Sequence, residues 1–443
     1  MHRQTDRQAA ATSRALGLAL AVAPSIATSA AIGFALMLAG HGQLLLGSTS
    51  SAKAAATLLL LVGAGGALLL QRSLAPLLGA AARTEEEGEP MPRWLQWSIA
   101  LALLLLVGTT LHATWRAPDG GWDAWSIWNS RARALLRSGG DVRLACAAGR
   151  GAALFTLHPE YPLLLPTMIA LGWRSLGSET PLVPMLLGLA PALWLAAIGA
   201  LVIARSSARS AGFTTLLLLT TPEFARMASA QYAELALSVL VMTALALLLL
   251  ADELVETQPG RRWLLLLAGH SLGLAALVKH EGLVWLLACA LVTLVSRRRD
   301  LLPFALGAAL PLVLLGWFKH SFAPPSDLAN GDLVTTLAHL PTRIGQTALG
   351  LVRRIVYVQA WGVHLLAVTA MLALRMHRRD LSRPALALLS ICGVVLGGFL
   401  CAYLISPHEL TWHLHASIDR LLLQLWPPAL LALGLPQRVP ARA

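Results

Sequence analysis

The chain has 443 residues, of which 56% are hydrophobic and only 13% are charged. Soluble globular proteins carry roughly 25% charged residues, so this composition excludes an ordinary soluble domain. The formal net charge is +12 at pH 7. Because the arginines are spread among loops between apolar runs, this charge indicates membrane topology and anion binding rather than nucleic-acid recognition.

Cysteine usage excludes a disulfide framework and a cysteine-based metal centre. The chain has four cysteines. Cys289, Cys392 and Cys401 lie inside apolar runs, and Cys146 stands alone in a hydrophilic loop. No CxxC motif and no Cys/His metal spacing occurs.

Apolar runs near the ~20 residues that cross a hydrocarbon core recur through the whole sequence. The first run follows Arg3, Arg7 and Arg14. At about 25 residues it exceeds the apolar core of a signal peptide, so we expect it to stay as an uncleaved helix. The pattern predicts an all-α polytopic membrane protein with about 12 transmembrane helices, at residues 15–39, 54–71, 97–114, 181–204, 211–222, 234–251, 263–278, 282–296, 301–317, 359–375, 384–405 and 420–436.

The arginines predict the orientation of these spans, because short arginine-rich loops face the cytoplasm. With a cytoplasmic amino terminus, every arginine-rich loop after spans two, four, six, eight and ten falls on the cytoplasmic side, and so does the carboxyl terminus. The run 161–173 is too short to span and contains two prolines, so we expect an interfacial or re-entrant helix there. It lies within a long external region, 115–180.

The spans group into three expected segments. Residues 1–96 hold two transmembrane helices, and residues 97–317 hold a catalytic transmembrane module with the external loop 115–180. Residues 318–443 hold a further external loop and the carboxyl-terminal helices.

The stretch GGWDAWSIWNSRARAL, residues 120–135, follows the third span. Trp122, Trp125 and Trp128 recur at i, i+3 and i+6 on one helical face, which is typical of a helix lying in the lipid headgroup layer. That interpretation does not explain Asp123, because an ionised carboxylate near a low-dielectric surface costs free energy unless it is used or paired. Catalytic use of Asp123 is our hypothesis, and a structural ion pair is the alternative. Asp119, beside two glycines, is interpreted as a turn residue.

Arginines continue on this external side, where the charge bias disfavours them. Arg131, Arg133 and Arg137 therefore suggest an anionic partner, and guanidinium groups match phosphate oxygens. We expect a lipid phosphate or diphosphate there. The alternatives are ordinary headgroup contacts or, for Arg131 and Arg133, an ion pair with Asp123.

Two further external motifs carry polar side chains. HPEYP, residues 158–162, introduces the short prolyl helix and directs His158 and Glu160 toward the mouth of the bundle. QYAEL, residues 231–235, places Tyr232 and Glu234 at the start of a span. Glu234 either caps that helix or faces a substrate.

The VKHEG tip, residues 278–282, joins two apolar helices with three successive ionisable residues. Lys279 is one of only three lysines in the chain, and His280 and Glu281 follow it. Ionisable groups at membrane depth are functional hypotheses by default, so we expect this tip to contact substrate.

The stretch SPHELTWHLHASIDR, residues 406–420, offers His413 and Arg420 as further contacts. His408, Glu409 and His413 do not form a HExxH zinc motif, because the two histidines are five residues apart instead of four. We expect Arg420 to contact phosphate, with a local ion pair to Asp419 or Glu409 as the alternative.

Together these motifs resemble the GT-C superfamily of polytopic glycosyltransferases. An acid in the first long external loop, HPEYP before a short helix, YAEL, and a KHEG tip occur in that order. The resemblance is closest to bacterial members of the dolichyl-phosphate-mannose protein mannosyltransferase and aminoarabinose-transferase type. It covers residues 97–300, with WHLHASIDRLLLQLWP near the end. WDAWSIWN with HPEYPLLLP also looks like an uncharacterised bacterial group within the superfamily.

The resemblance implies a GT-C-like fold with external interfacial helices after the third span. It implies transfer of a sugar from a polyprenyl-phosphate donor to a glycan, lipid or protein acceptor, with inversion, at the periplasmic face of a bacterial inner membrane. By resemblance Asp123 is the base. Many members have an Asp-Glu pair in this loop and YAD in the later motif, whereas Ala124 follows Asp123 here and Glu234 replaces the later Asp. This departure leaves open the identity of the base and a role for a divalent cation.

With these roles, the expected partners are membrane lipids, the lipid-linked donor and the acceptor, and no nucleic acid. The candidate substrate-binding side chains are Trp122, Trp125, Arg131, Arg133, His158, Glu160, Tyr232, Glu234, Lys279, His280, Glu281, His413 and Arg420.

Two other functions fit parts of the pattern. A transporter or flippase of a lipid-linked or anionic substrate would also use outward-facing arginines, but transporters usually place polar groups near the midplane and show repeated halves. The charges here gather at one face, which favours the transferase. A non-enzymatic assembly factor would need neither Asp123 nor Lys279.

Overall fold

The computed structural model describes residues 2–81, 90–147, 158–326, 339–356 and 360–437, without the side chains at 2–9 and 80–81. Within these ranges the chain is helical and contains no β-strand; an isolated bridge joins Leu381 to Gln437. The all-α prediction is therefore confirmed for the part of the chain described.

The helices follow one another with short connections. They are α1 (His2–Leu38), α2 (Gln43–Leu46), α3 (Ser50–Ala81), α4 (Arg93–Arg116), the π-helix η1 (Ala124–Trp128), α5 (Asn129–Ser138), α6 (Val142–Ala145), α7 (Leu164–Leu176), α8 (Leu182–Ala204), α9 (Ala208–Thr220), α10 (Pro222–Ala230), α11 (Ala233–Glu253), α12 (Pro259–Val278), α13 (Glu281–Arg297), the 3₁₀ turn η2 (Arg298–Asp300), α14 (Leu301–Ser321), α16 (Leu340–Val356), α17 (His364–His377), α18 (Arg383–Ile405) and α19 (Leu410–Gly434).

Each of the twelve expected spans overlaps one of these helices, and residue 359, the first of the span 359–375, lies outside the described residues. Among the described residues, seven helical segments are long and apolar enough to cross a membrane by length and composition. One of the seven, Glu281–Ser321, contains two expected spans, which meet at η2. Helices α9 and α17 are shorter than a bilayer core, with 13 and 14 residues. The run 161–173 forms the separate 13-residue helix α7 and is not one of the seven.

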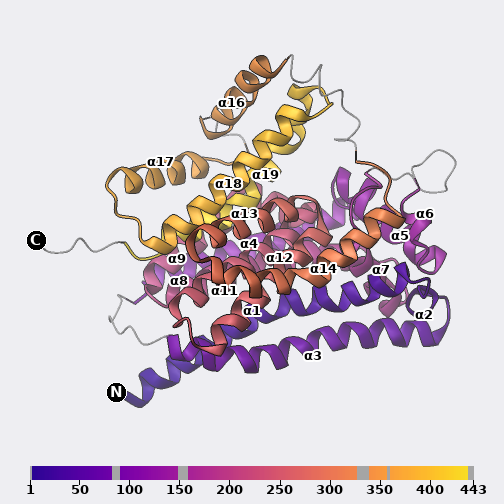
Figure 1. Cartoon of the computed structure of the whole chain (residues 1–443), viewed down its shortest axis with the longest axis horizontal. Helices are drawn as coiled ribbons and strands as arrows, with labels where there is room; N and C mark the ends of the chain where they lie inside the picture. Colours follow the sequence, from indigo (N-terminus) through magenta and orange to yellow (C-terminus); the bar gives the residue numbers. More distant parts are fainter. Residues whose placement is uncertain (1, 82–89, 148–157, 327–338, 357–359, 438–443) are drawn as a thin grey trace, which may run out of the picture.

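Helix α11 is the centre of the bundle. In its apolar window 89% of the residues are buried, against 17% for α3 and 22% for α4. It packs against α12, α8, α19 and α1. Figure 1 shows α1 and α3 as a long antiparallel pair along one side of this bundle. The outer helices keep exposed leucines, such as Leu104 on α4 and Leu310 on α14, as expected for surfaces that contact lipid.

Glycines bring α12 and α14 into close contact. A Cβ atom at Gly269 would lie 1.9 Å from the carbonyl oxygen of Phe304, and one at Gly307 would lie 1.9 Å from that of Leu266. Small residues at such contacts let helix backbones approach closely, which drives helix packing in membranes. This contact fixes the end of α12, and therefore Lys279.

The arginine-rich connections meet at one end of the bundle. Arg205, after α8, pairs with Glu253 at the end of α11, with 2.6 Å between nitrogen and oxygen. Arg261, at the start of α12, pairs with Asp300 in η2. The three loops therefore lie on the same side, as the distribution of arginines predicts. The other end carries α2, α5, α6 and α7, at the right of Figure 1.

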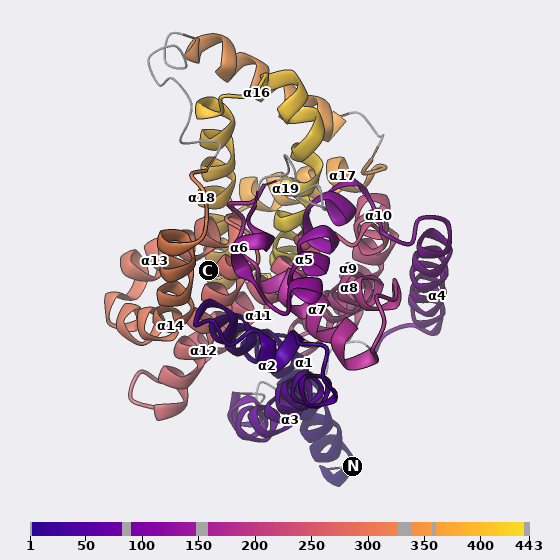
Figure 2. The ribbon, with the colours of Figure 1, turned by 90° about the vertical axis from the view of Figure 1, so that its right-hand side faces the viewer.

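The carboxyl-terminal helices form a separate projection. Helix α16 packs against α18 and α19, and Figure 2 shows these three helices on the side of the molecule away from α1 and α3. Helix α19 also packs against α11, so it connects this projection to the core.

Candidate active site

A chain of alternating charges lies where α11, α12, α13 and α19 meet. Arg420, on α19, pairs with Asp123, which directly precedes η1. The Arg420 guanidinium also lies 3.7 Å from Glu234 Oε1. Lys279 Nζ lies 3.0 Å from the same Glu234 oxygen and 2.7 Å from Glu281 Oε1. Three carboxylates and two cations, far apart in sequence, therefore form one cluster.

The local backbone places Glu234 and Lys279 inside the protein. Gln231 adopts the left-handed conformation, with φ +61°, and ends α10 just before α11 begins. Glu234 then stands in the first turn of α11, where the helix dipole favours an acid. Lys279 is extended and ends α12, so its ammonium group turns into the cluster. The capping alternative for Glu234 does not exclude the ion pair, because one carboxylate satisfies both.

Asp123 and Glu234 are the two carboxylates that contact Arg420, and Asp123 is the more accessible of them. Its side chain is 20% exposed, whereas that of Glu234 is 1% exposed. The sequence offered Arg131 or Arg133 as ion-pair partners of Asp123, and the structure supplies Arg420 instead. Arg420 Nη1 contacts both carboxylates and so holds the Asp123 side chain toward Glu234.

The HPEYP loop lies beside this cluster. Lys279 Nζ is 5.9 Å from the centre of the Tyr161 ring, which stacks on His158 and meets the edge of His280. Glu160 is buried, and its Oε1 lies 3.1 Å from His158 Nδ1. Burial acts to raise the pKa of Glu160, but the hydrogen bond and charge of His158 outweigh it and hold this pKa below its usual value. The loop therefore presents an ionised acid and two stacked rings to the cluster.

Tyr161 and Lys319 also belong to this region, although neither was among the site residues predicted from the sequence. Lys319 Nζ donates a hydrogen bond of 2.6 Å to the carbonyl oxygen of Glu160 and so anchors the loop to α14. Its rarity, as one of three lysines, was the available signal. Burial raises the pKa of the Tyr161 hydroxyl, which keeps it protonated at neutral pH.

Several buried polar atoms in this region have no hydrogen-bond partner among the described residues. They are Glu234 Oε2, Arg420 Nε, His280 Nε2 and His413 Nδ1. Buried polar groups are nearly always hydrogen-bonded, so unpaired atoms of this kind need an explanation. A bound polar ligand or water would supply the missing partners.

Arg131 does not reach the cluster. It is 0% exposed and donates hydrogen bonds to the carbonyl oxygens of Ala145, Pro159 and Tyr161, at 3.0, 3.0 and 2.7 Å. These bonds hold the HPEYP loop against α5. Arg131 is enclosed by its own chain and is outside the donor site proposed below.

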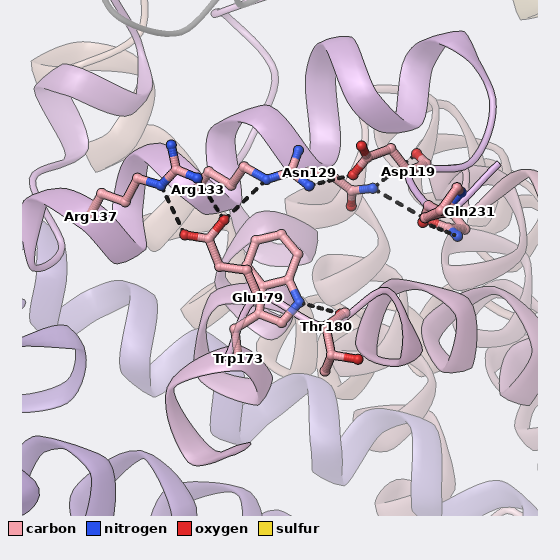
Figure 3. Close-up of polar contacts among 9 residues, drawn as sticks. Asp119, Asn129, Arg133, Arg137, Trp173, Glu179, Thr180 and Gln231 are labelled. Atoms are coloured by element: carbon pink, nitrogen blue, oxygen red, sulfur yellow. Dashed lines mark hydrogen bonds and ion pairs between the residues drawn. The ribbon is translucent and has the colours of Figure 1, made fainter. Parts of the chain in front are cut away.

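Arg133 and Arg137 form a separate network, drawn in Figure 3. Arg133 pairs with Asp119 and lies over the Trp173 ring at 5.4 Å. Both arginines pair with Glu179, at 3.3 Å and 2.8 Å. We expected a lipid phosphate as the anionic partner of these arginines, but carboxylates of the same chain pair with them. Arg133 therefore also lies outside the proposed site.

The tryptophan stripe is split in the structure. Trp122 and Trp125 are exposed and contact each other edge to face at 4.8 Å, whereas Trp128 is buried. Trp128 ends the π-helix η1, whose wider turn moves it off the face that carries Trp122 and Trp125. The prediction of one common face was wrong for Trp128.

The remaining predicted residues lie around Arg420. Tyr232 has its ring 5.5 Å below the Arg420 guanidinium. His413, two helical turns before Arg420, contacts the Tyr403 ring at 4.8 Å. Among the described residues no group of three His, Cys, Asp or Glu side chains could hold a metal ion, so the proposal below assigns no residue to a cation.

The fold and this cluster define a polytopic helical protein with an ionisable site at one end of its bundle. No protein-family model and no curated protein sequence matches the chain. Among solved structures, ArnT from Cupriavidus metallidurans, in the apo state, is similar over 75% of this chain with a TM-score of 0.49 and 20% sequence identity. The matched region spans 59% of the ArnT chain.

Proposed function

We propose that the protein is a membrane glycosyltransferase of the GT-C type, which moves a sugar from a polyprenyl-phosphate donor to an acceptor hydroxyl. The observation that carries this proposal is the cluster of Asp123, Glu234, Lys279 and Arg420, with its accessible carboxylate and its unpaired buried atoms. The order of the WDAW, HPEYP, YAEL and KHEG motifs supports the same class.

In the proposed reaction, Asp123 accepts the proton of the acceptor hydroxyl while that oxygen attacks the anomeric carbon. The bond between this carbon and the phosphate oxygen of the donor breaks, and polyprenyl phosphate leaves with the bonding electron pair. The configuration at the anomeric carbon inverts. A positioned general base contributes roughly 10² to 10⁴ in rate.

Arg420 and Lys279 have the charge to stabilise the departing phosphate. Both are already held by carboxylates, so their positions are fixed before substrate binds, and little reorganisation is needed when charge develops. Binding of the donor phosphate exchanges part of the Arg420 contact with Asp123 for a contact with phosphate. That exchange frees Asp123 to accept the acceptor proton.

Mass analysis of lipid-linked sugars and surface glycans, in cells with and without the gene, tests this function. We expect loss of the gene to accumulate one lipid-linked sugar and to remove that sugar from a surface glycan or lipid. Loss of a transporter or flippase would also accumulate the intact donor, but in the cytoplasmic leaflet, where a membrane-impermeant reagent added to spheroplasts does not reach its sugar. Unchanged lipid-linked sugars and unchanged glycans would reject the transferase.

A further inference from the structure

Helix α19 carries a second polar region on the face opposite to the charged cluster. His413 and Arg420 lie two helical turns apart and share the cluster face. Thr411, Leu414 and Ile418 lie on the other face, where they and α16 enclose a cavity of about 680 Å³. This cavity is therefore separated from Asp123 by the body of α19.

Helix α16 places its apolar side outward. Thr347 is buried, and a Cβ atom at Gly350 would lie 3.2 Å from Leu414 on α19, so this side faces the protein. On the opposite side Val352 and Val356 are about half exposed, at 54% and 53%. A helix on the surface of a soluble protein instead turns its apolar side inward and its polar side to water. Exposed apolar side chains are typical of a helix that lies against lipid in the membrane interface.

Basic side chains from both helices line the cavity between them. Arg353, Arg354 and His415 line it with Gln346 and Thr411. Arg354 Nη1 lies 3.5 Å from Asp419 Oδ2. Arg353 has no hydrogen-bond or ion-pair partner within the described ranges. Two guanidinium groups next to hydroxyl and amide donors match the oxygens of a phosphate group.

Apolar side chains complete the cavity. Leu349, Leu414 and Ile418 lie among the polar lining residues, on the same two helices. A ligand that satisfies this mixed lining has both a phosphate group and hydrocarbon. The lipid-facing side of α16 places such a molecule within lateral reach of the cavity.

We propose that this cavity binds the phosphate headgroup of an anionic bilayer lipid, with its acyl chains against the apolar side chains of the lining. The site is independent of the proposed transfer reaction, because it lies on the other face of α19. Its occupant holds α16 on α19 and thereby stabilises the carboxyl-terminal projection.

Lipid binding to the full chain, purified in a neutral detergent, tests the proposal. Native mass spectrometry would measure binding of phosphatidylglycerol, phosphatidylcholine and inorganic phosphate to the wild type and to the double variant Arg353→Gln, His415→Gln. Arg116→Gln is the matched control, since Arg116 is an exposed arginine at the end of α4. Binding is read without any transfer assay, so failure of the proposed function would not affect the result.

We expect phosphatidylglycerol to bind at least roughly tenfold more tightly than phosphatidylcholine, and the double variant to lose this preference. Arg116→Gln should bind like the wild type. Equal binding of the two lipids, or a double variant that keeps the preference, would overturn the proposal. If inorganic phosphate binds as tightly as phosphatidylglycerol, the cavity is a site for free phosphate and the lipid proposal is wrong.

Discussion

Glu234 and Lys279 are buried charges that depend on each other. Glu234 is 1% exposed and Lys279 is 5% exposed. Removing ions from water is costly, and their attraction offsets this cost only when both partners are present. Arg420 and Glu281 extend the pair, so the cluster is a connected set of charges in which loss of one member leaves another uncompensated.

Lys279→Met should lower the free energy of unfolding by about 3 kcal/mol, because Glu234 keeps its charge with only the more distant Arg420 as partner. The midpoint of thermal unfolding in detergent measures this change. Lys53→Met removes an exposed lysine and should change the midpoint little. Adding Glu234→Gln to Lys279→Met should recover part of the loss, and a further additive loss would show that the two side chains are not coupled.

His280 makes stability depend on pH. Its burial, helped by the charge of Lys319, lowers the pKa of the imidazole to about 4 from an ordinary value of 6.5. The unfolded chain therefore binds a proton between pH 6.5 and 4 that the folded protein does not, so stability falls as the pH is lowered through this window.

In His280→Gln we expect the unfolding midpoint to vary less between pH 6.5 and 4.5 than in the wild type. At pH 7.5, where the imidazole is neutral in both states, protonation contributes no difference. His41→Gln, at an exposed histidine, is the control and should keep the wild-type slope. An unchanged slope in His280→Gln would place the acid sensitivity elsewhere.

At the scale of elements, the contact between α12 and α14 positions Lys279 and Lys319, which lie at the adjacent ends of these helices. Gly307 makes this contact, with room for no Cβ atom, whereas Gly316 on the same helix has nothing within 4 Å. The two glycines therefore have different reasons to be present, although both lie in one apolar helix.

Gly307→Ala should destabilise the protein by about 1 to 3 kcal/mol, because the added methyl forces the helices apart. Gly316→Ala should be neutral or stabilising by up to about 1 kcal/mol, because alanine favours the helix. Thermal unfolding of the two variants makes the comparison. Equal effects would mean that the close approach of α12 and α14 does not contribute to stability.

Most helices could be predicted from the sequence, because apolar length alone determines where a membrane helix lies. The position of each helix end was less predictable, and so was the π-helix Ala124–Trp128. The turn of Trp128 into the core depends on helical phase and on the packing of Tyr161 against its ring, at 5.8 Å. Neighbouring residues in sequence contain no information about that partner.

The site was predictable to the extent that isolated charges in apolar surroundings are costly. This argument selected Asp123, Glu234, Lys279 and Arg420, which the structure brings together. It also selected Arg131 and Arg133, whose partners are backbone carbonyls and local carboxylates. The free-energy cost of burying a charge shows that it needs a partner, but the tertiary fold determines which partner it has.

At the scale of the molecule, the arginine-rich end and the charged cluster lie at opposite ends of the bundle. We expect Asp141→Cys, in a chain without its native cysteines, to react with a membrane-impermeant maleimide in intact spheroplasts. Arg298→Cys, in the turn between α13 and α14, should react only after permeabilisation. The reverse pattern would invert the topology and place the cluster at the cytoplasmic face.

Asp123 is the base of the proposed transfer reaction, and the rate of sugar transfer by purified Asp123→Asn tests this role most directly. With the lipid-linked sugar identified by mass analysis as donor, we expect kcat to fall by roughly 10² to 10⁴, while the protein stays folded and still binds the donor because Arg420 keeps Glu234 as a partner at 3.7 Å. Asp119→Asn, which alters the network around Arg133 instead, should retain transfer. Wild-type transfer by Asp123→Asn would contradict the account.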